Sequence, residues 1–147
     1  MERLPAEVQK FLSGNNLATI ATISDDNDYP YVLPVFYVTD ESGILYFATH
    51  KDSKKLRNIL SHPHIGVAIT DPVNLMSLQL QGTATVVPQK YEMIQELLRA
   101  ANERSENSFP PFMKIEAGSM EIAAFTVHWY RLASYSEKDA VFAEGTL

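Results

Sequence analysis

The segment of residues 77–87 constrains the fold more than any other part of the chain. Apolar and polar side chains alternate along it, which is typical of a strand with one face in the core and the other in solvent. Gly82 lies in the middle of this strand, where glycine indicates a sharp bend of the kind found at the corner of a barrel. A long, bent, two-faced strand predicts a sheet that curves around its own core.

Further segments are rich in β-branched and aromatic residues, and this composition predicts more strands. They are residues 17–23, 31–38, 44–49, 65–70 and 120–134. Pro34 interrupts the second strand of the chain, and because proline cannot donate to a strand ladder it marks an edge or a bulge. Together with the short links between the early strands, the pattern predicts a mainly β fold: a closed antiparallel barrel of six strands with flanking helices.

Along the chain, helices are expected before the first strand and between later strands. A short amphipathic helix lies within residues 1–14, and a longer one spans residues 89–104 before a loop at residues 107–112. Residues 136–147 mix charged and apolar side chains and are expected to form a tail or an arm that packs on a partner. Since neither a repeat nor a linker interrupts the pattern, we expect one domain over residues 1–147.

A third helix is expected directly after the strand at residues 44–49. Asp52 or Ser53 can cap its start, and the His62–Pro63 pair ends it. The spacing of three aliphatic residues predicts that they face inward: Leu56, Ile59 and Leu60.

The 12 lysines and arginines are unevenly distributed along the chain. They are absent from residues 11–50 and from residues 58–89, while the short segment between these gaps is basic. The whole chain has a net charge of −6, which argues against nucleic acid as a partner. A basic cluster isolated in an acidic chain favours a local anion site, with a solvated helix face as the alternative. Its members are Lys51, Lys54, Lys55 and Arg57.

The position of this cluster favours phosphate. Thr49 closes a predicted strand, Ser53 begins a predicted helix, and Lys54 and Lys55 fall in the first helical turn. A helix N-terminus presents unpaired N–H groups and a partial positive charge, and both favour a bound phosphate. Lysine is mildly unfavourable there unless it meets an anion. The sequence therefore predicts a phosphate site at this junction, with His50 either as a further contact or as an exposed loop residue.

Four successive blocks of the sequence read LATIATIS, YPYVLPVFYV, ILYFATHKDSKKLRNILSHPHIGVAI and LQLQGTATVV. Together they resemble the pyridoxamine 5′-phosphate oxidase-like FMN-binding split-barrel family. The resemblance covers residues 17–87 and, more loosely, the strand near Trp129. It implies a split barrel, FMN as cofactor, and a flavin-dependent oxidoreductase acting on an unidentified small molecule. It also implies a homodimer with two cofactors in clefts at the interface.

The resemblance further implies where FMN is held. The phosphate contacts lie in residues 48–55, and the backbone of residues 32–35 runs beside the isoalloxazine ring. Residues 77–81 supply polar contacts to the pyrimidine edge or the ribityl chain, and the partner chain contributes Trp129 or Phe112. The implied cofactor residues are Val32, Leu33, Pro34, Val35, Ala48, Thr49, His50, Lys51, Ser53, Lys54, Lys55, Ser77, Gln79 and Trp129, with Gln81 as an alternative on the same strand.

The chain departs from the family at two places. Leu33 stands where many members carry an arginine that helps to hold the phosphate, and Pro34 removes a backbone donor from the same strand. The C-terminal Arg and His that grip pyridoxamine phosphate in the true oxidases have no clear counterpart, since only Arg131 follows Trp129 there. We therefore do not expect pyridoxamine phosphate oxidase activity itself.

Other site types have little support in the sequence. Cys is absent, which excludes disulfides and thiol catalysis and fits a cytoplasmic protein. No Gly-x-Ser-x-Gly elbow or Walker loop is present, and the four histidines lack the spacing of a metal site, so no metal is expected. Two alternatives to an enzyme stay open: a non-catalytic module that binds flavin, deazaflavin or haem, and a cofactor-free barrel dimer.

Overall fold

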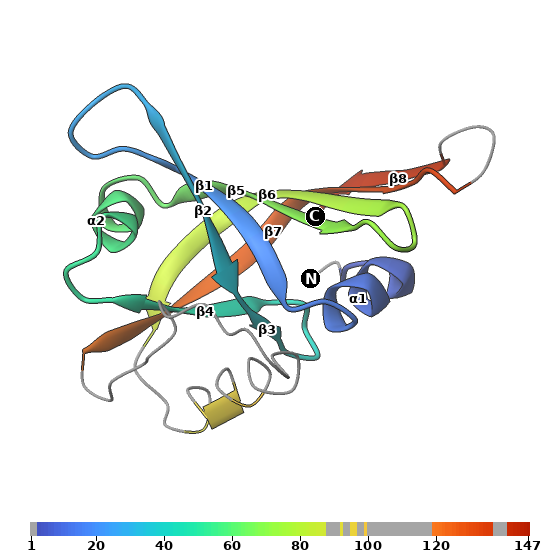
Figure 1. Cartoon of the computed structure of the whole chain (residues 1–147), viewed down its shortest axis with the longest axis horizontal. Helices are drawn as coiled ribbons and strands as arrows, with labels where there is room; N and C mark the ends of the chain where they lie inside the picture. Colours follow the sequence, from blue (N-terminus) through green and yellow to red (C-terminus); the bar gives the residue numbers. More distant parts are fainter. Residues whose placement is uncertain (1–2, 88–91, 93–94, 97–98, 100–118, 137–140) are drawn as a thin grey trace.

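The computed structural model describes residues 3–87, 92, 95–96, 99, 119–136 and 141–147. Strands dominate the described residues (Figure 1). In chain order the elements are α1 (Ala6–Ser13), β1 (Leu17–Ile23), β2 (Pro30–Phe36), β3 (Val38–Thr39), β4 (Leu45–His50), α2 (Lys54–Ser61), β5 (His64–Asp71), β6 (Met76–Val87), β7 (Met120–Ser134) and β8 (Val141–Thr146).

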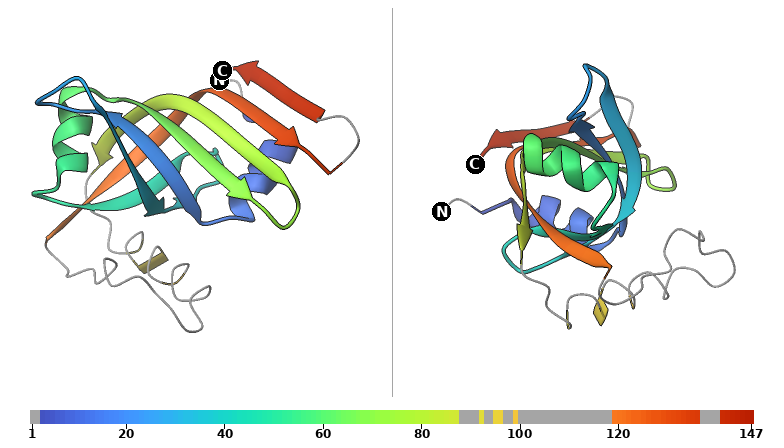
Figure 2. Two further views of the ribbon diagram at one scale, coloured as in Figure 1. Left: turned by 45° about the horizontal axis from the view of Figure 1, so that its top comes forward. Right: turned by 90° about the vertical axis from the view of Figure 1, so that its left-hand side faces the viewer.

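All strands belong to one antiparallel sheet in the order β2-β1-β5-β6-β7-β4-β3, and β8 also pairs with β7. Figure 2 shows this sheet curling around a central core. The two ends of the order, β2 and β3, are consecutive in the chain and are separated only by Tyr37. Tyr37 is buried, and its hydroxyl donates to the carbonyl of Leu12 at 2.8 Å. The sheet is therefore a split barrel, as the family resemblance implies, and not the closed barrel that the strand pattern predicts.

The described residues form eight strands rather than the expected six. The segment at residues 31–38 divides into β2 and β3, because the chain turns inward at Tyr37. Residues 141–146 form β8 on the chain's own β7, although residues 136–147 were expected to be a tail or a partner-binding arm. The strand pattern of β8 is short and includes Gly145, so only its pairing with β7 reveals it. The helix expected at residues 89–104 and the loop at 107–112 lie largely outside the described residues, although residues 92, 95–96 and 99 are helical.

The irregularity predicted at Gly82 is present. The register between β6 and β7 shifts between Gln81 and Gly82. A Cβ atom at Gly82 would lie 2.0 Å from the carbonyl oxygen of Thr126, a distance that no side chain can adopt. Glycine is therefore required here because the backbone of β7 approaches so closely.

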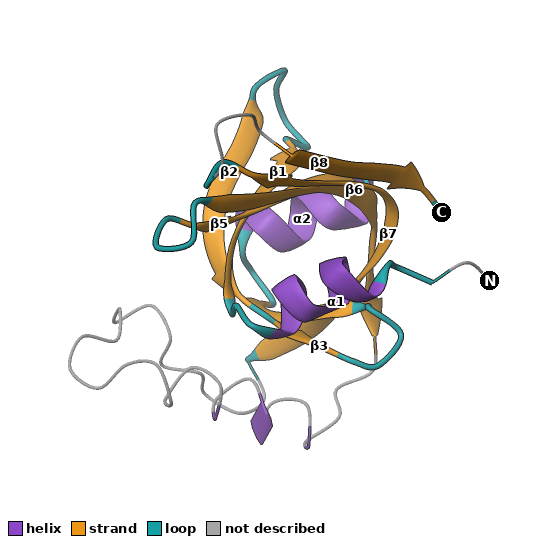
Figure 3. Ribbon diagram, turned by 90° about the vertical axis from the view of Figure 1, so that its right-hand side faces the viewer, coloured by secondary structure: helices purple, strands orange, loops and turns teal. Residues whose placement is uncertain are grey.

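The two described helices lie at opposite ends of the barrel, α1 at one mouth and α2 at the other (Figure 3). Val8, Phe11 and Leu12 of α1 are buried, which agrees with the amphipathic helix expected within residues 1–14. On α2, Leu56 and Ile59 are buried as predicted, but Leu60 is 67% exposed and Asn58 is fully buried in its place. No described helix combines the length and the hydropathy that crossing a membrane requires.

Candidate cofactor site at the junction of β4 and α2

The junction between β4 and α2 is held together by its own hydroxyl groups. Thr49 is buried at the end of β4, and its hydroxyl lies 2.8 Å from that of Ser53. The Ser53 oxygen accepts a hydrogen bond from the backbone N–H of Leu56 at 3.1 Å, which makes Ser53 the N-cap of α2. Lys51 N–H donates to the Ser119 carbonyl at 3.0 Å and so ties the connecting turn to the segment before β7.

This arrangement leaves donors at the start of α2. The first N–H groups of any α-helix have no acceptor within the helix. Ser53 satisfies the N–H of Leu56, so those of Lys54 and Lys55 are left for solvent or a ligand. The helix dipole adds a partial positive charge at the same point. These donors and this charge can accept an anion, and the phosphate site itself stays a prediction.

Lys55 is the most unusual charge at the junction. Its ammonium group lies 5.9 Å from the centre of the Phe47 ring on β4, and burial lowers the pKa of Lys55 to about 8. Within the part of the chain that the structure describes, no carboxylate lies within 4.0 Å of it. A half-buried ammonium group without an acidic partner is stabilised by an anion that arrives from outside.

Lys54 has different neighbours from Lys55. Its ammonium group lies 3.5 Å from a carboxylate oxygen of Asp26 and 5.4 Å from the centre of the Tyr31 ring. Arg57, one turn further along α2, lies 3.7 Å from Asp25. Two of the basic residues therefore already contact the turn between β1 and β2.

A buried amide fixes this turn on α2. The Asn58 side chain donates to the Thr22 hydroxyl at 2.9 Å and accepts the N–H of Asp25 at 3.0 Å. Sequence reasoning did not identify Asn58, Asp26 or Tyr31 as parts of the site. A polar residue inside an otherwise apolar helical stripe was the one available signal, and it points only to Asn58.

The predicted residues of β2 divide between two faces. Val32 and Pro34 are exposed on the outer face, whereas Leu33 packs against the core and Val35 is buried in it. Among the described strands, β2 stands at one end of the sheet order and pairs with β1. The outward side chains of β2 are the ones that can meet a cofactor. Tyr31 links the strand to Lys54 at the junction.

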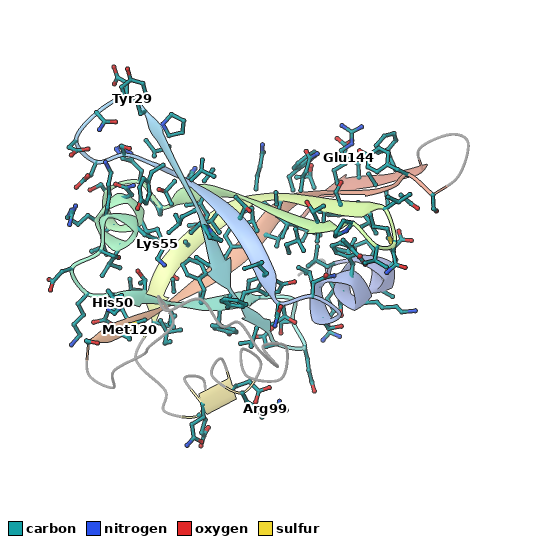
Figure 4. All side chains as sticks on the ribbon, viewed as in Figure 1. Tyr29, His50, Lys55, Arg99, Met120 and Glu144 are labelled. Carbon is teal, nitrogen blue, oxygen red and sulfur yellow. The ribbon has the colours of Figure 1, made fainter. Side chains whose placement is uncertain are left out.

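The remaining predicted residues form two groups. His50 and Lys51 are exposed at the junction, and Figure 4 shows His50 on the same side of the molecule as Lys55. Ala48 packs on the outside of the sheet against Ile122. By contrast, Ser77, Gln79 and Trp129 lie towards the far ends of β6 and β7, and Phe112 falls outside the described residues.

The spacing of these two groups follows from strand register. Thr49 pairs with Glu121, which precedes Trp129 by eight residues on β7. At about 3.3 Å per residue, Trp129 lies roughly 26 Å along the strand from the junction. The Trp129 indole donates to Glu144 at 3.2 Å, and Figure 4 shows Glu144 on the opposite side of the molecule from Lys55. One chain therefore does not bring Trp129 to the junction.

A sequence profile of the pyridoxamine 5′-phosphate oxidase family matches residues 4–134, which is most of the chain. The chain belongs to this family. The predicted resemblance is thereby confirmed. No curated protein sequence matches the chain.

Solved structures with the same fold include other proteins described as related to pyridoxamine 5′-phosphate oxidase. An FMN-binding protein from Nostoc punctiforme is 13% identical with a TM-score of 0.67, and the match covers 100% of this chain and 99% of that one. A protein from Clostridium acetobutylicum related to general stress protein 26 is 12% identical with a TM-score of 0.65, covering 96% and 92%. At these identities the likeness shows the fold.

A third similar structure is described as a haem-binding protein from Mycobacterium smegmatis. It is 19% identical with a TM-score of 0.62, and the match covers 99% of this chain but 60% of that chain. Members of this fold are therefore described with different cofactors. As for metals, the described residues contain no group of three or more His, Asp or Glu side chains placed to hold an ion.

Proposed function

We propose that this chain binds FMN, with the phosphate at the junction of β4 and α2. The observation that carries the proposal is the half-buried Lys55 beside the capped start of α2, where backbone N–H groups have no acceptor within the helix. A dianionic phosphate satisfies both at once, because it pairs with ammonium groups and accepts from backbone N–H groups. Family membership and the FMN-binding neighbour support this choice of anion.

Each residue of the junction has a separate task in this proposal. The N–H groups of Lys54 and Lys55 and their ammonium groups bind the phosphate, while Thr49 and Ser53 fix the turn that positions them. Leu33 points to the core where many family members place an arginine, so the junction holds the phosphate without help from β2. Bound FMN supplies hydride transfer, which makes the protein an oxidoreductase acting on a small molecule.

We further propose that the protein works as a homodimer. Val32, Leu17 and Ile23 are 58%, 48% and 49% exposed on the outer face of β1 and β2, an apolar surface that a second copy would cover. In such a dimer the partner supplies Trp129 and Gln79, which lie too far from the junction in their own chain. For Trp129 this is the arrangement that the family resemblance implies.

A spectrum of the purified protein followed by titration with FMN and riboflavin tests the proposal. We expect flavin absorbance or uptake of FMN, and weaker binding of riboflavin because it lacks the phosphate. Replacing both Lys54 and Lys55 by alanine should weaken FMN far more than riboflavin. A colourless protein that takes up no FMN at tens of micromolar would rule the proposal out. Reduction of bound FMN by NADH or NADPH separates an oxidoreductase from a flavin store.

Haem is the second candidate cofactor, because one structural neighbour is described as haem-binding. The described histidines His50, His62, His64 and His128 are exposed, so none is buried in a ready-made haem pocket. The same titration with haem decides between the two. A Soret band that saturates at one haem per chain, without FMN uptake, would favour this candidate.

A further inference from the structure

The turn between β1 and β2 is acidic and lies beside the first turns of α2 (Figure 1). It carries Asp25, Asp26 and Asp28, and the Ser24 hydroxyl closes it by donating to the Tyr29 carbonyl. The family resemblance assigns no role to this turn. Its position next to the basic cluster suggests a function in anion binding.

The turn is held in place by side chains of α2. Asn58, fully buried, bonds both to Thr22 at the end of β1 and to the N–H of Asp25 in the turn. Arg57 adds a contact to Asp25 at 3.7 Å. Because these contacts anchor the residue next to it, Asp26 is presented to α2 by a fixed scaffold.

The carboxylate of Asp26 forms an ion pair with Lys54. One oxygen is 3.5 Å from the Lys54 ammonium group and also accepts from the Asn27 amide at 3.0 Å. The Tyr31 ring flanks the same ammonium group. Lys54 is therefore held on the turn by an internal anion and directed differently from Lys55, which lies over Phe47.

We propose that Asp26 is a specificity-determining residue that competes with the cofactor phosphate for Lys54. This inference rests on the proposed FMN site. Binding of a phosphate at the start of α2 requires Lys54 to leave Asp26, so the ion pair lowers the affinity for phosphate-bearing ligands. A neutral flavin such as riboflavin makes no such demand. Asp26 therefore sets how strongly the site prefers phosphorylated over unphosphorylated flavin.

The size of the effect follows from the exposure of the pair. The Lys54 and Asp26 side chains are 30% and 64% exposed, so solvent screens their attraction. Exposed ion pairs of this kind change equilibria by about two- to fivefold. We expect Asp26→Asn to tighten FMN by about that factor and to leave riboflavin unchanged. Raising the ionic strength to about 0.5 M should shrink the gain.

Asp28→Asn is the matched control. Asp28 is exposed in the same turn and carries the same charge, but no ion pair or hydrogen bond involves its carboxylate among the described residues. Both variants change the net charge equally, so the difference between them isolates the direct contact. The experiment is calorimetric titration of FMN and riboflavin into wild type and both variants.

A double-mutant cycle with Lys54→Gln makes the assignment specific. In the Lys54→Gln background, Asp26→Asn should no longer tighten FMN, because the competitor has lost its cation. If wild-type protein binds no FMN, the proposed function fails and this inference with it. If FMN binds but Asp26→Asn matches Asp28→Asn, weakens FMN, or shifts riboflavin equally, the inference alone is overturned.

Discussion

At the scale of single residues, two positions stand in unusual surroundings. Lys55 is an ammonium group half-buried over an aromatic ring, and Gly82 is a glycine whose missing side chain admits the backbone of β7. Each leads to a prediction that concerns one group: the ammonium group of Lys55 and the missing Cβ of Gly82.

The affinity for FMN should fall as pH rises through about 8. Burial lowers the pKa of free Lys55 to about 8, and a bound phosphate raises it, so above pH 8 binding must take up a proton. Riboflavin lacks the phosphate and serves as the reference. Ionisation of the flavin ring affects both ligands equally and therefore cancels in the ratio of the FMN and riboflavin affinities. Titrations between pH 7 and 9.5 measure the effect.

Two variants sharpen this pH test. Lys55→Arg stays charged over the whole range and should flatten the profile, whereas Lys55→Met should weaken FMN at every pH. A profile for wild type as flat as that of Lys55→Arg would show that Lys55 does not meet the phosphate.

Gly82→Ala should destabilise the protein by about 3 kcal/mol or prevent folding, because overpacking against backbone is costly. The new Cβ would lie 2.0 Å from the Thr126 carbonyl oxygen. Gly66→Ala on the neighbouring β5 is the control, since its nearest atom would be 3.9 Å away. Urea unfolding of both variants measures the difference, and equal midpoints would contradict the assigned role of Gly82.

At the scale of elements, the position of α2 depends on the residues that it packs against. Its buried residues are Leu56, Asn58 and Ile59, whereas Leu60 faces solvent. The position of α2 therefore depends on an amide that bridges to the β1–β2 turn as well as on aliphatic contacts.

Asn58→Ala should lower the free energy of unfolding by about 1–3 kcal/mol, because Thr22 and the Asp25 N–H lose a buried partner. Leu60→Ala, at an exposed site of the same helix, should change it by less than about 0.5 kcal/mol. Chemical unfolding followed by circular dichroism provides both values. A larger loss for Leu60→Ala would mean that α2 packs through its other face.

At the scale of the whole molecule, the site is divided between two regions. The phosphate junction lies at one end of the barrel, and Trp129 with Gln79 lies well along the sheet. Under the proposed function a second copy completes the flavin site, and the apolar outer face of β1 and β2 is the surface that we expect it to cover.

Val32→Glu should turn a dimer into a monomer in sedimentation and weaken FMN at least tenfold, since a charge in an apolar interface loses its hydration. Leu60→Glu, an exposed leucine away from that sheet face, is the control and should stay dimeric. Trp129 is the single tryptophan of the chain, so FMN should quench its emission in the dimer only. A wild-type monomer that binds FMN fully would remove the shared site.

The sequence by itself determined the strand pattern, the glycine of β6 and the strand–turn–helix with its cap at Ser53, because these depend on local periodicity and capping. Only the tertiary structure decided the split of the barrel at Tyr37, the pairing of β8, the inward turn of Asn58 and the contact of Asp26 with Lys54. These depend on groups far apart in the chain, whose encounter no local pattern encodes. The same holds for Trp129, whose distance from the junction follows from register alone.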